Sequence, residues 1–131
     1  STYPELLKKL IKIVSWGTVE AGGYGFGDAE NLVEIAEPTK KTFIKCEDDS
    51  FAYLFAGCTK LEKVSYELFD STPNAINFDR AFYDCYSLKT GPKIWERANA
   101  SQIPENQRTY AHCNSFDKTG LSTDILNKYF K

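Results

Sequence analysis

Hydrophobic residues recur along this chain in a short motif, F-x-x-C-x-x-L, which occurs twice in full. The two full copies are FAGCTKL at 55–61 and FYDCYSL at 82–88. Two related segments keep the same spacing, FGDAENL at 26–32 and YAHCNSF at 110–116. The aromatic residues that begin the copies lie at positions 26, 55, 82 and 110, so the intervals are 29, 27 and 28 residues. A near-constant period in this range predicts a solenoid, in which each unit buries its apolar side against the next.

The second copy indicates how one unit should fold. From Phe55 onward, apolar residues recur at every third position, which is typical of a tight helical turn. Farther along, the period changes to two, and this predicts a short strand with Val64 and Tyr66 on the inner face and Ser65 outside. Residues 70–74 (DSTPN) are rich in turn formers and should return the chain to the next copy.

Three of the four cysteines, Cys58, Cys85 and Cys113, stand at the same position of the motif, and Ala29 holds that position in the first copy. Because a small apolar residue replaces Cys there, the position needs volume rather than a thiol, and we expect buried free thiols. Disulfides are the alternative, because coils stacked about 5 Å apart would bring neighbouring thiols within bridging distance. Cys46 lies outside the register, and its state is left open.

The first 20 residues are expected to form a helix that covers the first coil. Thr2 and Glu5 have the spacing of a capping box, and Pro4 falls in the first turn. The apolar stripe of this helix would consist of Leu6, Leu7, Leu10, Ile11 and Val14. With Lys8, Lys9 and Lys12 opposite, the stripe would alternatively suit a membrane surface or a partner helix.

A second helix is predicted at the other end, where Gly120 interrupts the last copy of the motif. This helix would bury Ile125, Leu126, Tyr129 and Phe130. The predicted fold is therefore a single α/β solenoid domain, a leucine-rich-repeat-like stack of about four coils with a small parallel sheet. Its expected parts are an N-terminal cap helix at 1–20, repeats at 21–118 and a C-terminal cap helix at 119–131.

The composition fits one globular domain and argues against two classes of partner. The 131 residues are 42% hydrophobic and 26% charged, enough to bury one core. A formal net charge of −2 creates no field that would attract nucleic acid or an anionic membrane. No apolar run approaches the length of a membrane span, so no membrane insertion is expected.

The one catalytic arrangement that the sequence suggests is a nucleophilic Cys–His pair. The only histidine, His112, precedes Cys113 directly. Adjacent residues on an extended or turning segment point apart, and Cys113 is already assigned to the interior. We therefore expect His112 to lie on the surface and predict that the chain is not an enzyme.

Two short segments carry weaker chemical signals. The segment GGYGFGD at 22–28 has the glycines of a phosphate-binding loop, but it lacks a preceding hydrophobic strand and a Lys, so a turn is expected. The segment CEDDS at 46–50 gathers three carboxylates without the alternation or the glycine of an EF-hand, so a solvated acidic loop is expected. We predict no catalytic residue, no cofactor and no metal ion.

The repeats resemble the leucine-rich repeats of the BspA-like group, including its DUF285-type relatives in bacterial surface proteins, whose units run as A-F-x-x-C-x-x-L-x-x-I. The segment most similar to that family is LFDSTPNAINFDRAFYDCYSLKT at 68–90. The resemblance covers roughly residues 21–118. It weakens where Ala29 replaces Cys and where Gly91 and Pro92 stand in place of a strand residue, which would interrupt the sheet. The resemblance implies a non-catalytic binding or structural module on a bacterial cell surface or a phage particle.

Aromatic residues outside the repeat core are the best candidates for a binding surface. Aromatics make up 15% of the chain, and Tyr and Trp offer a large, stiff contact area with a polar tip. The repeat does not require burial of Tyr53, Tyr83, Tyr86 or Trp95. The outward strand positions Lys63, Ser65 and Glu67 complete the candidate ligand-binding set.

From these observations we expect a non-catalytic module that recognises a protein or glycan through a surface of its repeats. The alternative is a structural or assembly component of a larger fibre, virion or surface polypeptide. The oligomeric state stays open.

Overall fold

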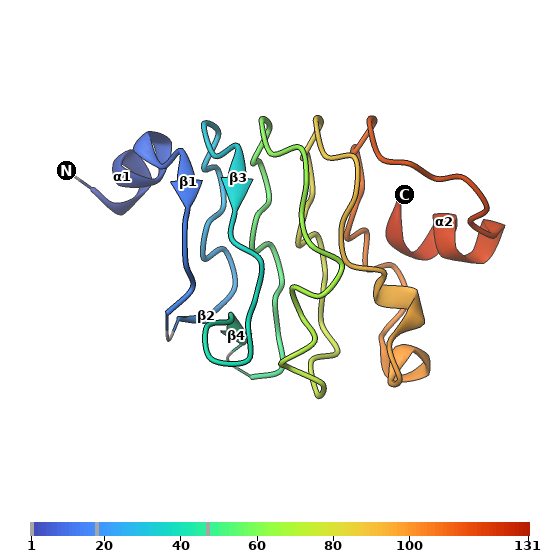
Figure 1. Cartoon of the computed structure of the whole chain (residues 1–131). Helices are drawn as coiled ribbons and strands as arrows, with labels where there is room; N and C mark the ends of the chain where they lie inside the picture. Colours follow the sequence, from blue (N-terminus) through green and yellow to red (C-terminus); the bar gives the residue numbers. More distant parts are fainter. Residues whose placement is uncertain (1, 18, 47) are drawn as a thin grey trace.

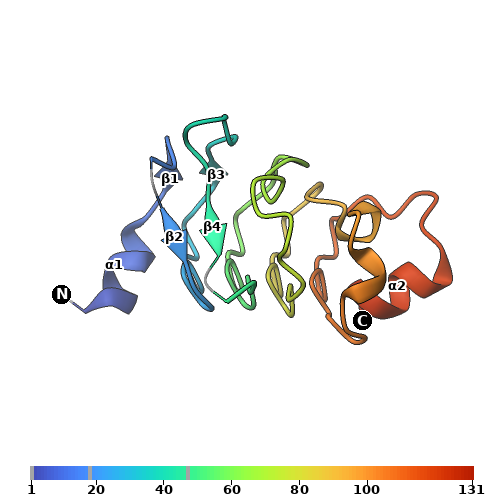
Figure 2. The ribbon, with the colours of Figure 1, turned by 90° about the horizontal axis from the view of Figure 1, so that it is seen from below.

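The computed structural model describes residues 2–17, 19–46 and 48–131. In Figure 1 the chain passes up and down through a row of thin layers that follow one another in sequence order. The N-terminal helix α1 lies at one end of the row, and the C-terminal helix α2 lies at the other. Figure 2, turned by 90°, shows the same order, with segments about one motif apart lying side by side.

The predicted fold class, an α/β solenoid of about four coils with a small parallel sheet and capping helices, is wrong. The α-helices of the described residues are α1 (Tyr3–Lys9) and α2 (Thr123–Tyr129), and the 3-10 helices are η1 (Ile94–Glu96) and η2 (Ala100–Gln102). The strands are β1 (Lys12–Ile13), β2 (Glu20–Ala21), β3 (Glu34–Ile35) and β4 (Lys45–Cys46). They form two separate two-stranded parallel sheets, β1 with β3 and β2 with β4. Turns make up most of the rest of the chain.

The hydrogen bonds of the motif explain why strands are short. In the second copy the amides of Tyr53, Phe55 and Gly57 donate to carbonyls of the next layer at 2.7 to 2.8 Å. The amides between them donate three residues back and close successive tight turns. Positive φ angles at Tyr53 (59°) and Gly57 (78°) produce this turn geometry. Each amide from Tyr53 to Thr59 donates to a backbone carbonyl without an extended segment, so these layers meet through turns rather than through one sheet.

A stack of aromatic rings runs through the centre of these layers. Phe26 lies 5.3 Å from Phe55, Phe55 lies 5.5 Å from Phe82, and Phe82 lies 5.3 Å from Tyr110, all between ring centroids. The planes of each pair are within 12° of parallel. Phe130, directly after α2, continues the stack at 5.3 Å from Tyr110. The spacing of the motif thus predicted correctly which rings meet, although it did not predict the fold class.

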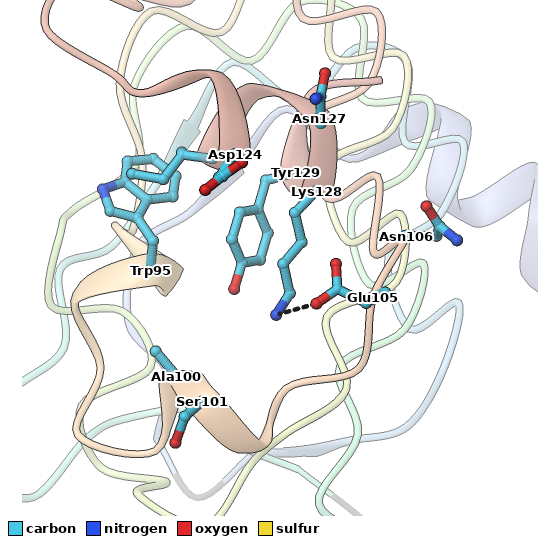
Figure 3. Close-up of a pocket in the computed structure, with 10 residues that line it drawn as sticks. Trp95, Ala100, Ser101, Glu105, Asn106, Asp124, Asn127, Lys128 and Tyr129 are labelled. Atoms are coloured by element: carbon cyan, nitrogen blue, oxygen red, sulfur yellow. Dashed lines mark ion pairs between the residues drawn. The ribbon is translucent and has the colours of Figure 1, made fainter.

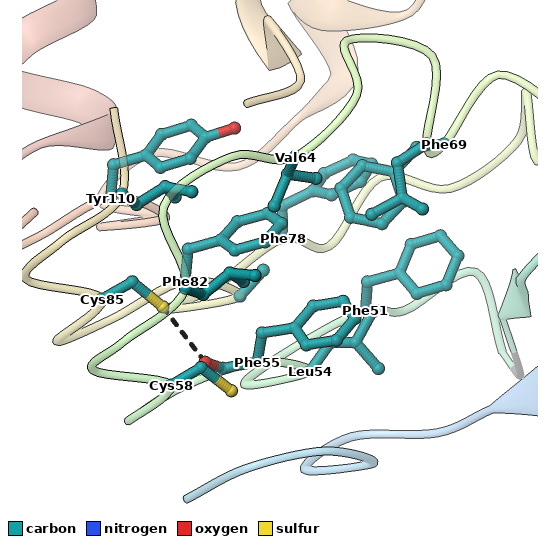
Figure 4. Packing of buried hydrophobic residues seen from close by; sticks show 14 of the residues in the cluster. Phe51, Leu54, Phe55, Cys58, Val64, Phe69, Phe78, Phe82, Cys85 and Tyr110 are labelled. Atoms are coloured by element: carbon teal, nitrogen blue, oxygen red, sulfur yellow. Dashed lines mark hydrogen bonds between the residues drawn. The ribbon is translucent and has the colours of Figure 1, made fainter. Parts of the chain in front are cut away.

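The motif cysteines form a second buried row beside the rings. Cys58, Cys85 and Cys113 are buried, and all four cysteines are free, so the predicted free thiols are confirmed. Each of these three thiols donates to the carbonyl of the aromatic residue that begins the preceding copy, as Cys85 does to Phe55 at 3.2 Å (Figure 4). The thiols therefore fill volume and tie one layer to the next.

The N-terminal helix is shorter than its apolar stripe suggested. The predicted capping box of Thr2 and Glu5 is present, but α1 ends at Lys9 and buries only Leu7. The backbone of the next residue is extended, and the chain continues into β1. Ile11 and Val14, which lie on either side of this two-residue strand, are 58% and 85% exposed, contrary to the prediction.

The C-terminal helix comes closer to its prediction. Ser122 caps the N-terminus of α2 by accepting a hydrogen bond from the amide of Ile125. Tyr129 and Phe130 are buried as expected, whereas Ile125 and Leu126 are half-buried.

The prediction that Val64 and Tyr66 both face inward is only half correct. Val64 is 2% exposed, but Tyr66 is 55% exposed because a turn, and not a strand, begins there. Only an isolated parallel bridge between Lys63 and Thr90 forms in this region. Past Thr90, the buried Pro92 accepts a hydrogen bond through its carbonyl from the hydroxyl of Tyr110.

The thiol row generates a test of the core. Cys85→Ala should destabilise the fold by about 1 kcal/mol, because Ala at this position of the motif is already accommodated at position 29. Cys85→Asp should cost several kcal/mol and unfold the domain, because it buries an unpaired carboxylate. Urea unfolding followed by circular dichroism measures both values, and equal tolerance of the two substitutions would contradict the buried row.

Candidate functional site

A run of planar side chains lies on the outer side of the turn layers. It consists of Tyr24, Tyr53, Arg80, Tyr83 and His112, which we call the aromatic edge. The rings of Tyr24 and Tyr53 stack at 4.4 Å with planes 15° apart. The guanidinium of Arg80 lies 5.6 Å from the centre of the Tyr53 ring, and its Nη1 donates to the Tyr53 hydroxyl at 3.0 Å.

Arg80 joins the two halves of the aromatic edge. Its guanidinium also lies 5.9 Å from the ring centre of Tyr83, and the Tyr83 ring lies 4.9 Å from that of His112. His112 Nδ1 is 2.6 Å from Asp84 Oδ1, which holds the imidazole in place. The nearby carboxylate of Asp84 raises the pKa of the exposed Tyr86 hydroxyl.

Three of the candidate residues predicted from sequence belong to this part of the molecule. Tyr53 and Tyr83 are members of the aromatic edge, and Tyr86 borders it beside Asp84. The sequence reasoning missed Tyr24 and Arg80, although both stand two residues before the aromatic residue of their copy, as Tyr53 does.

Arg108 follows the same register, so this register is a signal that could have found Tyr24 and Arg80, but it does not include Tyr83 or His112. His112 was predicted only as a surface residue, and it is exposed. Sequence register alone does not reveal its pairing with Asp84.

The outward strand positions line a different hollow. Lys63, Ser65 and Glu67 surround a cavity of about 340 Å³ together with Tyr66. The ammonium of Lys93 lies 5.2 Å from the centre of the Tyr66 ring, so part of that ring is already occupied. The seven residues predicted from sequence to bind a ligand therefore do not form one site.

Trp95 lies near the C-terminal end of the row of layers. Its ring is half-buried against Tyr129 and Phe130, at centroid distances of 5.7 and 5.9 Å. It also lines a pocket of about 600 Å³ between η2 and α2, shown in Figure 3.

The geometry does not pair His112 with Cys113. His112 Nδ1 faces Asp84, whereas the thiol of Cys113 donates into the core to the carbonyl of Phe82 at 3.1 Å. Burial raises the pKa of Cys113 to about 12, so its thiolate is scarce near neutral pH.

The two segments with weaker chemical signals form turns. Residues 23–28 of the glycine-rich segment are turns, as predicted. Asp48 and Asp49 are exposed in a turn with positive φ, and Glu47, the third carboxylate of the acidic loop, lies outside the described residues. Within 2–17, 19–46 and 48–131, no group of three or more His, Cys, Asp or Glu side chains is arranged to hold a metal ion.

Neither α1 nor α2, nor any other helix in the described part of the chain, is long and apolar enough to cross a membrane.

No protein-family model, curated protein or solved structure matches this chain. The resemblance to BspA-like repeats therefore stays a prediction from sequence.

The burial of the thiols predicts how they react. Burial raises the pKa of Cys58 and Cys113 to about 12 and holds that of Cys85 well above its usual range, while Cys46 is only half-buried. At pH 8 the native protein should react with 5,5′-dithiobis(2-nitrobenzoic acid) at Cys46 alone, and the three buried thiols should react only after denaturation. Cys46→Ser, the matched control, should abolish the native reaction. Rapid native reaction of a second thiol would show that the row is open to solvent.

Proposed function

We propose that the chain is a non-catalytic binding module that recognises a protein or glycan through the aromatic edge. The observation that supports this proposal is the unbroken contact of five planar side chains across successive layers, from Tyr24 to His112. Tyr and Arg are enriched among the residues that contribute most to binding energy at protein interfaces. Because neighbours already hold these side chains, a ligand would immobilise little further freedom on binding.

A protein partner fits the aromatic edge better than a glycan does. Sugars bind aromatic residues by lying against an open ring face. The Tyr53 ring has Tyr24 stacked against it and the guanidinium of Arg80 near it. The edge instead offers hydroxyl groups, a guanidinium and an imidazole, which suit the polar backbone and side chains of a protein surface.

Binding rather than catalysis is supported by the state of the only Cys–His neighbours. His112 is engaged by Asp84, and the Cys113 thiol lies in the core with a raised pKa. The setting that the family resemblance implies for such a module is a bacterial cell surface or a phage particle.

The proposal predicts a specific loss of binding in Tyr53→Ala. The immobilised chain would be exposed to extracts of candidate host cells and to a glycan array, with bound proteins quantified by mass spectrometry. A protein ligand should be retained at least tenfold less by Tyr53→Ala, a loss of about 1.4 kcal/mol, because the variant removes the ring that contacts both Tyr24 and Arg80.

Tyr66→Ala is the matched control, since Tyr66 is 55% exposed, carries a Lys93 ammonium over its ring and lies outside the aromatic edge. It should bind as the wild type does. Equal retention of every ligand by the Tyr53 and Tyr66 variants would contradict the proposal. Retention of glycans alone would exclude a protein partner.

A second candidate function, a component of an assembly with other copies of this chain, is favoured by one observation. Among the described residues eight large hydrophobic side chains are exposed, and six of them lie in the N-terminal part of the row: Tyr24 of the aromatic edge, and Tyr3, Leu6, Ile11, Val14 and Val33 outside it. Among the described residues, β1 pairs with β3 alone, so its other edge has no strand partner. An apolar surface next to an unpaired strand edge is a common site of self-association.

Sedimentation velocity over a wide concentration range tests this second candidate. Self-association through the N-terminal surface should give a mass that rises with concentration, and Val14→Asp should abolish the rise without unfolding the chain, because Val14 is 85% exposed. Glu67→Asp serves as a control away from that surface. A monomer at all concentrations would exclude assembly of copies through this surface.

A further inference from the structure

The pocket near the C-terminal end is built by three separate elements. Trp95 comes from η1, Ala100 and Ser101 come from η2, and α2 supplies a wall that includes Asp124 and Tyr129 (Figure 3). Its volume of about 600 Å³ is within the range of pockets that take small organic ligands.

Lysine 128 makes the floor of this pocket rigid. The Lys128 ammonium donates to the carbonyl of Ile103 at 2.8 Å and lies 3.7 Å from Glu105 Oε1. Its side chain is only 16% exposed, so this charge is fixed rather than mobile. Glu105 is thereby balanced in charge, although its carboxylate is 82% exposed and is free to accept further hydrogen bonds.

Several polar groups of the pocket make no side-chain hydrogen bond within the described residues. They are the side chains of Ser101, Asp124, Asn127 and Tyr129. Tyr129 as a whole residue is 2% exposed, and in Figure 3 its hydroxyl points toward the open space near Lys128. Burial and the nearby Glu105 raise the pKa of Tyr129 to about 12, so the hydroxyl stays protonated and can donate.

A half-buried indole among unpaired hydroxyl, carboxylate and amide groups is the chemistry that recognises a sugar. The C–H face of a pyranose packs on an aromatic ring, while its hydroxyl groups pair with planar polar side chains. No cation of the described residues lies within salt-bridge distance of Asp124, and Glu105 is offset by Lys128, so the pocket is net negative. Such a pocket repels sugars that carry a carboxylate or sulfate.

We propose that this pocket binds a neutral or amino-substituted saccharide of one or two rings, against Trp95 and between Asp124, Tyr129 and Ser101. This site is separate from the aromatic edge, so a loss of ligand at one place leaves the other intact. The chain would then carry two binding surfaces, one for a protein partner and one for a small glycan.

The test uses tryptophan emission, because the two tryptophans report different regions. Trp16 is 1% exposed and packs edge-on against Phe26, whereas Trp95 lines the pocket. The full chain is titrated with maltose, cellobiose and N,N′-diacetylchitobiose, and binding is confirmed by saturation-transfer NMR. At least one of these disaccharides should change the emission, and Trp95→Phe should remove that change while Trp16 emission persists.

Two further variants separate binding from folding. Asp124→Ala, at an exposed position of α2, should weaken the disaccharide at least tenfold, with an unchanged urea unfolding curve. Tyr53→Ala should leave the disaccharide titration unchanged even where it abolishes capture of a protein partner.

Three results would overturn the saccharide site. They are no saturation transfer from any of the three disaccharides at millimolar concentration, equal binding by wild type and Asp124→Ala, and equal binding of a disaccharide that contains glucuronic acid. Loss of protein capture in Tyr53→Ala with no saccharide binding would retain the proposed function and reject this site alone.

Discussion

Face-to-face contact between aromatic rings of successive layers is the interaction on which the rest of the structure depends. Neighbouring rings from Phe26 to Tyr110 are 5.3 to 5.5 Å apart, and this distance sets the spacing of everything attached to the same turns. Each stacked pair adds about 0.5–1.5 kcal/mol beyond the burial of its area. Because Tyr24 and Tyr53 lie two residues before two of these rings, the same succession of layers stacks them on the outside, at 4.4 Å. At the aromatic edge, as in the core, side chains of successive layers therefore contact one another, but on the surface of the molecule.

Hydrogen bonds between layers satisfy backbone groups in a fold that contains little regular helix or strand. Amides of the turn runs donate alternately within a turn and to the next layer, and the buried thiols add donors to the same carbonyls. In the loop that follows Leu68, the guanidinium of Arg97 donates to the carbonyls of Phe69 and Thr72 at 3.2 and 2.7 Å and lies 5.0 Å from the Phe78 ring. Burial lowers the pKa of this guanidinium, and the carbonyls satisfy its two terminal nitrogens, whereas its buried Nε has no hydrogen-bond partner among the described residues.

The sequence predicted correctly those features that depend on residue type and on the spacing between residues. The ring stack, the free thiols and the capping box of Thr2 all followed from residue type and interval. The fold class did not follow, because turns closed by positive φ angles replace much of the expected strand structure. The exposure of Tyr66, where a turn begins, and of Val14, just beyond the end of β1, did not follow either. Tyr53 and Tyr83 were candidates from composition, whereas the bridging role of Arg80 depends on a contact between layers that no local pattern encodes.

A double-mutant cycle on the ring stack tests the central claim most directly. Phe55→Leu and Phe82→Leu remove rings that lie 5.5 Å apart, and their unfolding free energies should be coupled by about 0.5–1.5 kcal/mol. Phe55→Leu and Tyr110→Leu, which are separated by the Phe82 ring, should instead be additive within about 0.5 kcal/mol. Additivity of the neighbouring pair, or equal coupling of the separated pair, would contradict an arrangement in which, within the stack, Phe55 contacts Phe82 but not Tyr110.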